Sequence, residues 1–128
     1  MTIAEVSKQY SLTPDTLRYY ERIGLIPKIA RTDSGLRDYS EADCRWVGFA
    51  KCMRNAGVQI NALVKYVSLF HEGRSTHDER KQILINQRAA LLEKMNKMQE
   101  SIDRLNQKIE RYEQLVLPVE EHLQERKN

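Results

Sequence analysis

The sequence lacks the features that mark several common classes of protein. Its 128 residues contain no uninterrupted apolar run of about 18, the length that a membrane-spanning helix needs. The first residues, MTIAEVSKQY, do not show the charged and then apolar order of a secretory signal. We therefore expect a cytoplasmic protein with no membrane partner.

Cysteine and histidine are also scarce. The two cysteines, Cys44 and Cys52, are too few for the disulfide framework of a small secreted domain. In one helix they would lie about 12 Å apart, whereas a disulfide requires Cα atoms within about 7 Å, so no bridge is expected between them. The three histidines are scattered along the chain, and metal ions need clustered ligands. We expect no metal site and no cofactor.

Motifs for catalysis are missing as well, and what the sequence has instead is charge. There is no glycine-rich phosphate loop and no nucleophile motif, so an enzyme is not expected. Charged residues make up 30% of the chain and apolar residues 41%, a balance typical of a helical protein with much surface. Residues 1–82 hold 13 Lys and Arg against 10 Asp and Glu, whereas residues 83–128 hold 8 against 8. This mild basic bias is compatible with binding to nucleic acid.

Helix-capping residues divide the first part of the sequence. Thr2 begins a capping box that predicts a helix near residues 3–9. After a tight connection, Thr13 caps a second helix, and Gly24 is a natural C-terminal stop for it. Two short helices joined in this way predict a helix-turn-helix over residues 3–23.

The segment that follows predicts a wing and two more helices. Residues 25–39 contain a polar turn before a glycine, so we expect a hairpin of two short extended segments. Apolar residues at helical spacing predict helices over 41–56 and 60–71, each followed by a glycine. The predicted fold is therefore mainly α, with a winged helix-turn-helix domain over residues 1–73.

A long helix is predicted over residues 76–117. It begins at a second capping box, Thr76 to Glu79, and Pro118 should end or kink it, leaving a C-terminal tail at 118–128. Apolar residues recur along it in alternating steps of four and three, which is a heptad seam. The seam consists of Leu91, Met95, Met98, Ile102, Leu105, Ile109, Tyr112, Val116 and Val119.

This seam indicates a homodimer. From Leu91 to Val116 the helix is about 39 Å long, and a lone helix cannot bury such a stripe. Packing within its own subunit is the alternative, but residues 1–73 are too compact to cover so long a rod. We therefore expect a coiled coil with a second copy of the chain.

The second helix has two different faces. Helical spacing turns Leu17, Tyr20 and Ile23 toward the core and sets Arg18, Tyr19 and Arg22 on the outside. Arginine can bond a guanine edge or neutralise a phosphate, and tyrosine can donate to a phosphate oxygen. A solvated charged face would explain this helix equally well. The following hairpin favours DNA, because a basic wing behind a recognition helix is suited to the neighbouring backbone or minor groove. Its candidate contacts are Arg31, Arg37 and Tyr39.

Taken together, these motifs resemble a MerR-family transcriptional regulator. The resemblance covers residues 1 to about 72, and a dimerising helix follows as in that family. The matching motifs are TPDTLRYYE at 13–21, IGLI at 23–26, Arg31, Gly35, Arg37, Tyr39-Ser40 and Gly57-Val58.

The resemblance implies an activator that binds a palindromic promoter as a dimer. Members of that family bend and untwist promoters whose −35 and −10 elements are too far apart, so that RNA polymerase engages both. It also implies an antiparallel coiled coil, an orientation that heptads cannot reveal, and a second, helical wing near residues 58–70. The DNA contacts that it implies are Arg18, Tyr19, Tyr20, Arg37 and Tyr39, with Lys65 in the second wing as a further phosphate candidate.

The resemblance narrows what the protein senses. Metal-responsive members carry a cysteine at the start of the dimerisation helix, where this sequence has Thr76 to Glu79. Drug-binding members carry a large C-terminal domain, and only ten residues follow Pro118 here. The remaining subgroup responds to aldehydes and other electrophiles through a thiol, and Cys52 matches its position. Cys44 as the sensor, or no thiol sensor at all, are the alternatives.

A different class of protein also has to be considered. A coiled-coil adaptor that binds other proteins would explain the heptad seam. It would not explain the arginine- and tyrosine-bearing helix or the basic hairpin.

Overall fold

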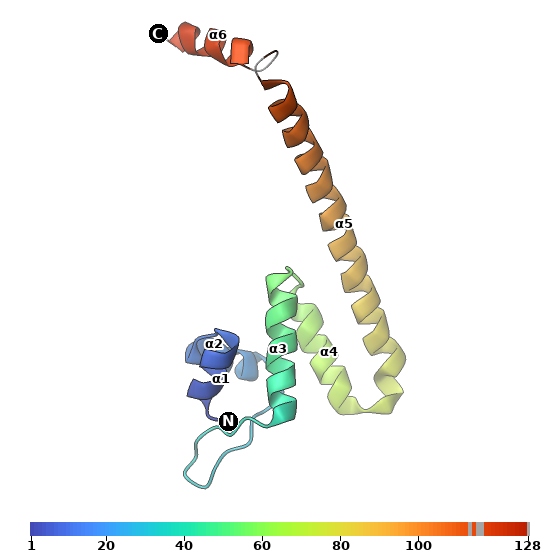
Figure 1. Ribbon diagram of the computed structural model, residues 1–128. Coiled ribbons are helices and arrows are strands. Elements are labelled where there is room, and N and C mark those ends of the chain that lie inside the picture. Colours follow the sequence, from blue (N-terminus) through green and yellow to red (C-terminus); the bar gives the residue numbers. More distant parts are fainter. Residues whose placement is uncertain (113, 115–116, 128) are drawn as a thin grey trace. The chain divides into compact units, whose positions relative to one another are not determined.

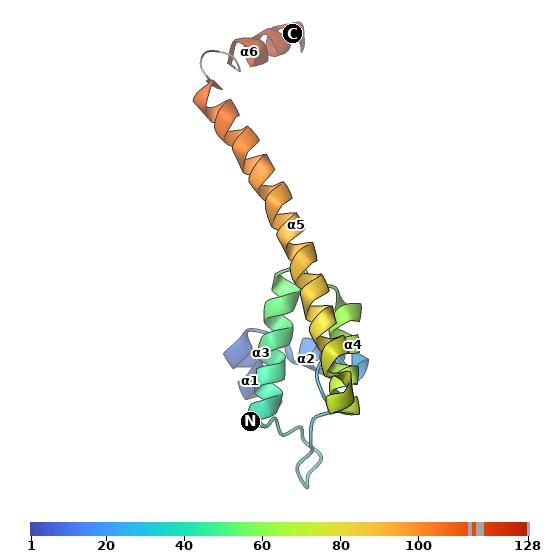
Figure 2. The same cartoon turned by 90° about the vertical axis from the view of Figure 1, so that its right-hand side faces the viewer.

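The computed structural model describes residues 1–112, 114 and 117–127. It divides into a unit Met1–Leu91 and a second unit that begins at Leu92. The described chain is mainly helical, as predicted, and Figures 1 and 2 show the order of its helices. The elements are α1 (Ile3–Tyr10), α2 (Pro14–Ile23), α3 (Glu41–Asn55), α4 (Ile60–Glu72), the 3-10 turn η1 (Arg74–Thr76), α5 (His77–Glu110) and α6 (Leu117–Lys127).

Local capping explains the boundaries of α1 and α2. The hydroxyl of Thr2 accepts a bond from the Glu5 N–H at 3.2 Å, and the Glu5 carboxylate accepts from the Thr2 N–H at 3.0 Å. Thr13 caps α2 by accepting from the Thr16 N–H at 3.1 Å. Gly24 ends α2 with a φ of 80°, a left-handed conformation that glycine adopts without strain. Both helices are therefore confirmed.

Helix α3 packs against both α1 and α4 (Figures 1 and 2). A capping box formed by Ser40 and Asp43 begins it. Gly48 allows α1 to pack closely against it, because a Cβ atom at this position would lie 3.2 Å from Cε1 of Tyr10. On the side facing α4, Trp46 packs edge-on against Phe70, with ring centroids 5.1 Å apart.

The core of this unit is shared by all of its elements up to α4. Residues from α1, α2, the wing segment, α3 and α4 form one buried cluster, so removal of apolar surface from water holds the unit together. Its members are Val6, Leu17, Tyr20, Leu25, Ile26, Ile29, Tyr39, Cys44, Val47, Ala50, Val58 and Leu63.

The wing is a loop rather than a pair of strands. Among the described residues its pairing is a single isolated antiparallel bridge between Arg31 and Arg37. The turn inside it is closed by the Gly35 N–H, which donates to the Thr32 carbonyl at 2.9 Å. The two expected extended segments therefore meet at this bridge, where the Thr32 N–H donates to the Leu36 carbonyl at 2.7 Å and the Asp38 N–H donates to the Ala30 carbonyl at 2.8 Å.

The connection from α4 to α5 differs from the sequence prediction. Gly73 ends α4 with a φ of 100°. Thr76 is buried, and its hydroxyl donates to the Leu69 carbonyl at 2.7 Å or to the Gly73 carbonyl at 2.8 Å and accepts from Arg80 Nε at 3.1 Å. The predicted capping box is therefore wrong, since this hydroxyl fastens the end of α4 instead.

The C-terminal helices also have other boundaries than expected. Helix α5 ends at Glu110, and residues predicted to form a tail belong to α6. Pro118 lies in the first turn of α6, where its missing N–H would have no helical partner in any case. No helix among the described residues is long and apolar enough to cross a membrane.

Candidate nucleic-acid interface

The outer face of α2 is cationic and accessible. Leu17 and Tyr20 are buried, whereas Arg18, Tyr19 and Arg22 are exposed. Arg18 Nη1 lies 2.9 Å from Oδ1 of Asp15, one turn away on the same face. The Arg22 guanidinium stacks over the Tyr19 ring at 5.2 Å from its centroid, which orients both side chains at the surface.

The wing is joined to α2 through Glu21. Arg37 Nε donates to Oε1 of this carboxylate at 2.7 Å, and the Ile29 N–H donates to its Oε2 at 3.1 Å. Burial alone would raise the pKa of Glu21, but the bonds from Arg37 and Ile29 hold it below its ordinary value. Arg31 remains exposed in the wing and donates to the Gly35 carbonyl at 3.3 Å.

Two predicted DNA contacts lie in the core. Tyr20 is buried, in line with its inward spacing on α2, and Tyr39 is only 2% exposed. Both side chains are members of the buried apolar cluster of this unit. The Tyr39 hydroxyl has no hydrogen-bond partner among the described residues, and burial raises the pKa of its phenol.

Helix α4 contributes one candidate contact. Lys65 is exposed and lies on a groove of about 620 Å³ that Tyr19 of α2 also lines. The remaining walls of this groove are Ile23, Ile60, Asn61, Val64, Ser68 and Leu69. The structure thus brings a cation from the predicted second wing next to the recognition helix.

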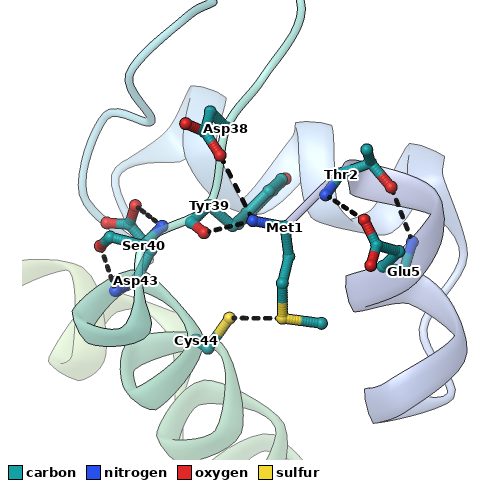
Figure 3. A network of polar contacts seen from close by, with 8 residues as sticks. All are labelled: Met1, Thr2, Glu5, Asp38, Tyr39, Ser40, Asp43 and Cys44. Atoms are coloured by element: carbon teal, nitrogen blue, oxygen red, sulfur yellow. Dashed lines mark hydrogen bonds and ion pairs between the residues drawn. The ribbon is translucent and has the colours of Figure 1, made fainter.

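The two thiols have opposite environments. Cys44 is buried, and its Sγ lies 3.8 Å from Sδ of Met1, whose ammonium group donates to the Tyr39 carbonyl at 2.8 Å (Figure 3). Burial raises the pKa of Cys44, and Asp43 and Glu41 raise it further against the effect of the ammonium. Cys52 is exposed on α3.

The two cationic side chains that flank Cys52 form hydrogen bonds to backbone carbonyls. Lys51 Nζ donates to the Tyr10 carbonyl, and Arg54 Nη1 donates to the Val58 carbonyl at 2.8 Å. Cys52 itself is exposed and is therefore not a core residue. In the described part of the chain, no cluster of three or more His, Cys, Asp or Glu side chains could hold a metal ion.

The heptad seam of α5 is exposed in the single chain. From Met95 to Tyr112 every described member of the seam is more than 40% exposed, while Leu91 packs against the core of the first unit. Val116 lies outside the described residues.

Sequence reasoning missed Glu21. Its partners Ile29 and Arg37 follow it by 8 and 16 residues, so no local pattern connects them. The available indication was a carboxylate inside the cationic stretch RYYER, close to an otherwise basic surface.

A capped helix-turn-helix with an exposed basic face, tied to a basic loop behind it, defines a winged helix-turn-helix protein. Residues 1–69 match the MerR HTH family of regulatory proteins, and the chain belongs to this family. Because that family consists of regulators, the chain is a regulatory protein and not an enzyme.

Individual relatives agree with this assignment. The HTH-type transcriptional regulator AdhR of Bacillus subtilis is 57% identical over 93 residues, which cover 73% of this chain and 66% of AdhR. A crystal structure described as a MerR family transcriptional regulator of Listeria monocytogenes has 43% identity and a TM-score of 0.87, covering 98% of this chain and 95% of that one. HiNmlR, a MerR family regulator bound to promoter DNA, shares the fold at 24% identity and a TM-score of 0.79, covering 88% of this chain and 89% of its own.

Proposed function

We propose that the protein is a transcriptional activator that binds a palindromic promoter as a homodimer and distorts an over-long spacer. The observation that carries the proposal is the exposed outer face of α2, where Arg18, Tyr19 and Arg22 stand free of the core. Arg31 of the wing lines a recess with Arg18, and Lys65 of α4 lines a groove with Tyr19, so both add to this basic surface. RNA polymerase is then an indirect partner, since it engages the promoter that the dimer has bent.

Dimerisation supplies the two copies that a palindrome requires. The exposed seam of α5 supports a coiled coil, because apolar residues at heptad spacing are stable in water only when a second helix covers them. An antiparallel arrangement rests on the family resemblance. Each half-site would then receive one recognition helix.

The proposed switch is the thiol of Cys52. Its exposure on α3 gives an aldehyde access that the buried Cys44 lacks. The thiolate would add to the carbonyl carbon, the carbonyl electron pair would move to oxygen, and that oxygen would take a proton to give a hemithioacetal. Such an adduct on α3 would change its packing and bias one of two dimer states.

DNA binding is tested by fluorescence anisotropy with a duplex selected in vitro from a random pool. We expect binding that weakens steeply with salt, and Arg18→Ala should weaken it further without dissociating the dimer. Arg45→Ala is a matched control, because Arg45 is also paired with a carboxylate one turn away, at 3.6 Å from Glu41 Oε1. A coiled-coil adaptor would bind no selected duplex at any salt concentration.

The thiol switch is tested in a reporter assay with an aldehyde as inducer. Cys52→Ala should keep DNA binding and lose the response, while Cys44→Ala should keep both. A full response in the Cys52 variant would favour the alternative regulator without thiol sensing and leave the DNA-binding proposal intact.

A further inference from the structure

Three arginines from two elements line one small recess. Arg18 of α2 and Arg31 and Arg37 of the wing face a space of about 150 Å³ between the wing and the start of α1. Its other walls are Thr2, Ile3, Gly35 and Leu36. Three like charges at one recess repel one another, so the arrangement is favourable only with an anion present or with each cation held by a partner.

Each arginine has such a partner, but the partners are not equivalent. Asp15, which pairs with Arg18, has a side chain that is 95% exposed, and an exposed pair of this kind is weak. Arg31 donates to the backbone carbonyl of Gly35, and its charge contributes to the lowered pKa of Glu21. Arg37 pairs with Glu21, whose side chain is 11% exposed, and it does so through Nε, at 2.7 Å.

The geometry of this last pair leaves part of the guanidinium available. Because Nε–H is taken by Glu21, the two terminal NH₂ groups of Arg37 are the donors that remain for a ligand. The carboxylate is itself fixed, since its second oxygen accepts the Ile29 N–H at 3.1 Å. Glu21 thus holds Arg37 in one orientation on the wall of the recess.

We propose that this recess receives one backbone phosphate of the DNA, and that Glu21 is the positioning residue that presents Arg37 to it. The inference rests on the proposed DNA-binding function. A phosphate fits the donor set, because guanidinium groups bind phosphate oxygens through charge-assisted hydrogen bonds.

The direction in which DNA affinity changes when the charge of Glu21 is removed distinguishes a positioning role from simple electrostatic repulsion. Removing a carboxylate next to DNA should tighten binding if Glu21 only repels phosphates. We expect Glu21→Gln and Glu21→Ala to weaken binding instead, by roughly 5- to 30-fold, because Arg37 loses its fixed orientation. Glutamine cannot replace the carboxylate, because the two donors meet separate oxygens of Glu21 and glutamine would place an NH₂ group opposite one of them. The duplex selected in vitro serves as the probe.

Asp15→Asn is the matched control for this measurement. It also removes a carboxylate that pairs with an arginine of the recess, but an exposed one. It should leave the affinity unchanged or raise it. If the Glu21 variants behave like Asp15→Asn, the inference is wrong.

A double-mutant cycle with Arg37→Ala shows whether Glu21 acts through Arg37. Glu21→Gln should cause no further loss in the Arg37→Ala background, and either variant should lower the slope of log affinity against log salt by about one. Additive losses or an unchanged slope would overturn the proposal. Should the Glu21 variants lose their helical circular dichroism, Arg37→Lys replaces them, because lysine has one ammonium nitrogen and cannot offer an Nε–H to the carboxylate and separate NH₂ groups to the phosphate. Arg37→Lys must then bind as weakly as Arg37→Ala, and wild-type affinity would overturn the proposal.

Failure of the unaltered protein to bind any duplex is a different result, because it would overturn the proposed DNA-binding function as well.

Discussion

Truncation of one seam residue tests whether α5 is a dimerisation helix. Leu105 is 59% exposed in the single chain, although it lies in the middle of the seam. Full burial of a leucine stabilises by about 1.5–3 kcal/mol, so covering its exposed part contributes about 1–2 kcal/mol per chain. Both chains of a homodimer carry the residue, which doubles the effect to about 2–4 kcal/mol.

Leu105→Ala should therefore raise the dimer dissociation constant roughly 30- to 800-fold, since each 1.4 kcal/mol corresponds to a factor of ten. Sedimentation equilibrium over a range of concentrations measures this constant directly. Glu100→Ala is the control, because Glu100 lies at heptad position f, on the side of the helix away from the seam. It should leave the constant unchanged.

Two results would refute this reasoning. One is an unaltered protein that sediments as a monomer at micromolar concentration. The other is a Leu105→Ala variant with the same dissociation constant as Glu100→Ala. In either case the exposed stripe would not be a contact between two copies of the chain.

Three further predictions concern buried polar groups. Tyr39→Phe should leave the free energy of unfolding, measured with urea, unchanged or raise it by up to about 1 kcal/mol. The reason is that the hydroxyl it removes is buried without a partner among the described residues. A loss above about 1 kcal/mol would contradict this. Thr76→Val should lower the same free energy by about 1–3 kcal/mol, because the Leu69 carbonyl loses its donor, whereas Thr76→Ser should not. Glu21→Gln should lower the free energy of unfolding by a constant amount above pH 4.5, the ordinary pKa of a glutamate side chain. This loss should shrink as the pH falls below 4.5, because a carboxylate with a lowered pKa stabilises the fold only while it is ionised. Urea unfolding at a series of pH values measures this difference, and a difference that grows toward low pH would show the opposite sign.

Much of the fold was predictable because its causes are local. The caps at Thr2, Thr13 and Ser40 act on backbone groups three residues away, so the starts of α1, α2 and α3 could be placed from the sequence. Gly24 and Gly73 end their helices in conformations that few other residues adopt easily. Helical spacing likewise separated the buried and exposed faces of α2.

Other features required the tertiary structure because they depend on partners far along the chain. Thr76 has the sequence context of a cap, yet its hydroxyl bonds the carbonyl of Leu69 on the preceding helix. Tyr39 was predicted to contact DNA from a basic hairpin, but it is buried in the cluster that residues of α1 to α4 share.

The two cysteines show the same division between local and distant causes. Both lie in one predicted helix, and the sequence alone left open which of them is accessible. Contact with Met1 and burial against the core cover Cys44, whereas Cys52 faces outward. What the sequence determined by itself is therefore the set of helices and the charges that they carry, since capping and periodicity act within a few residues. Which charges are held, which rings are buried and which thiol is exposed were decided only by packing, which joins residues such as Glu21 and Arg37 across the fold.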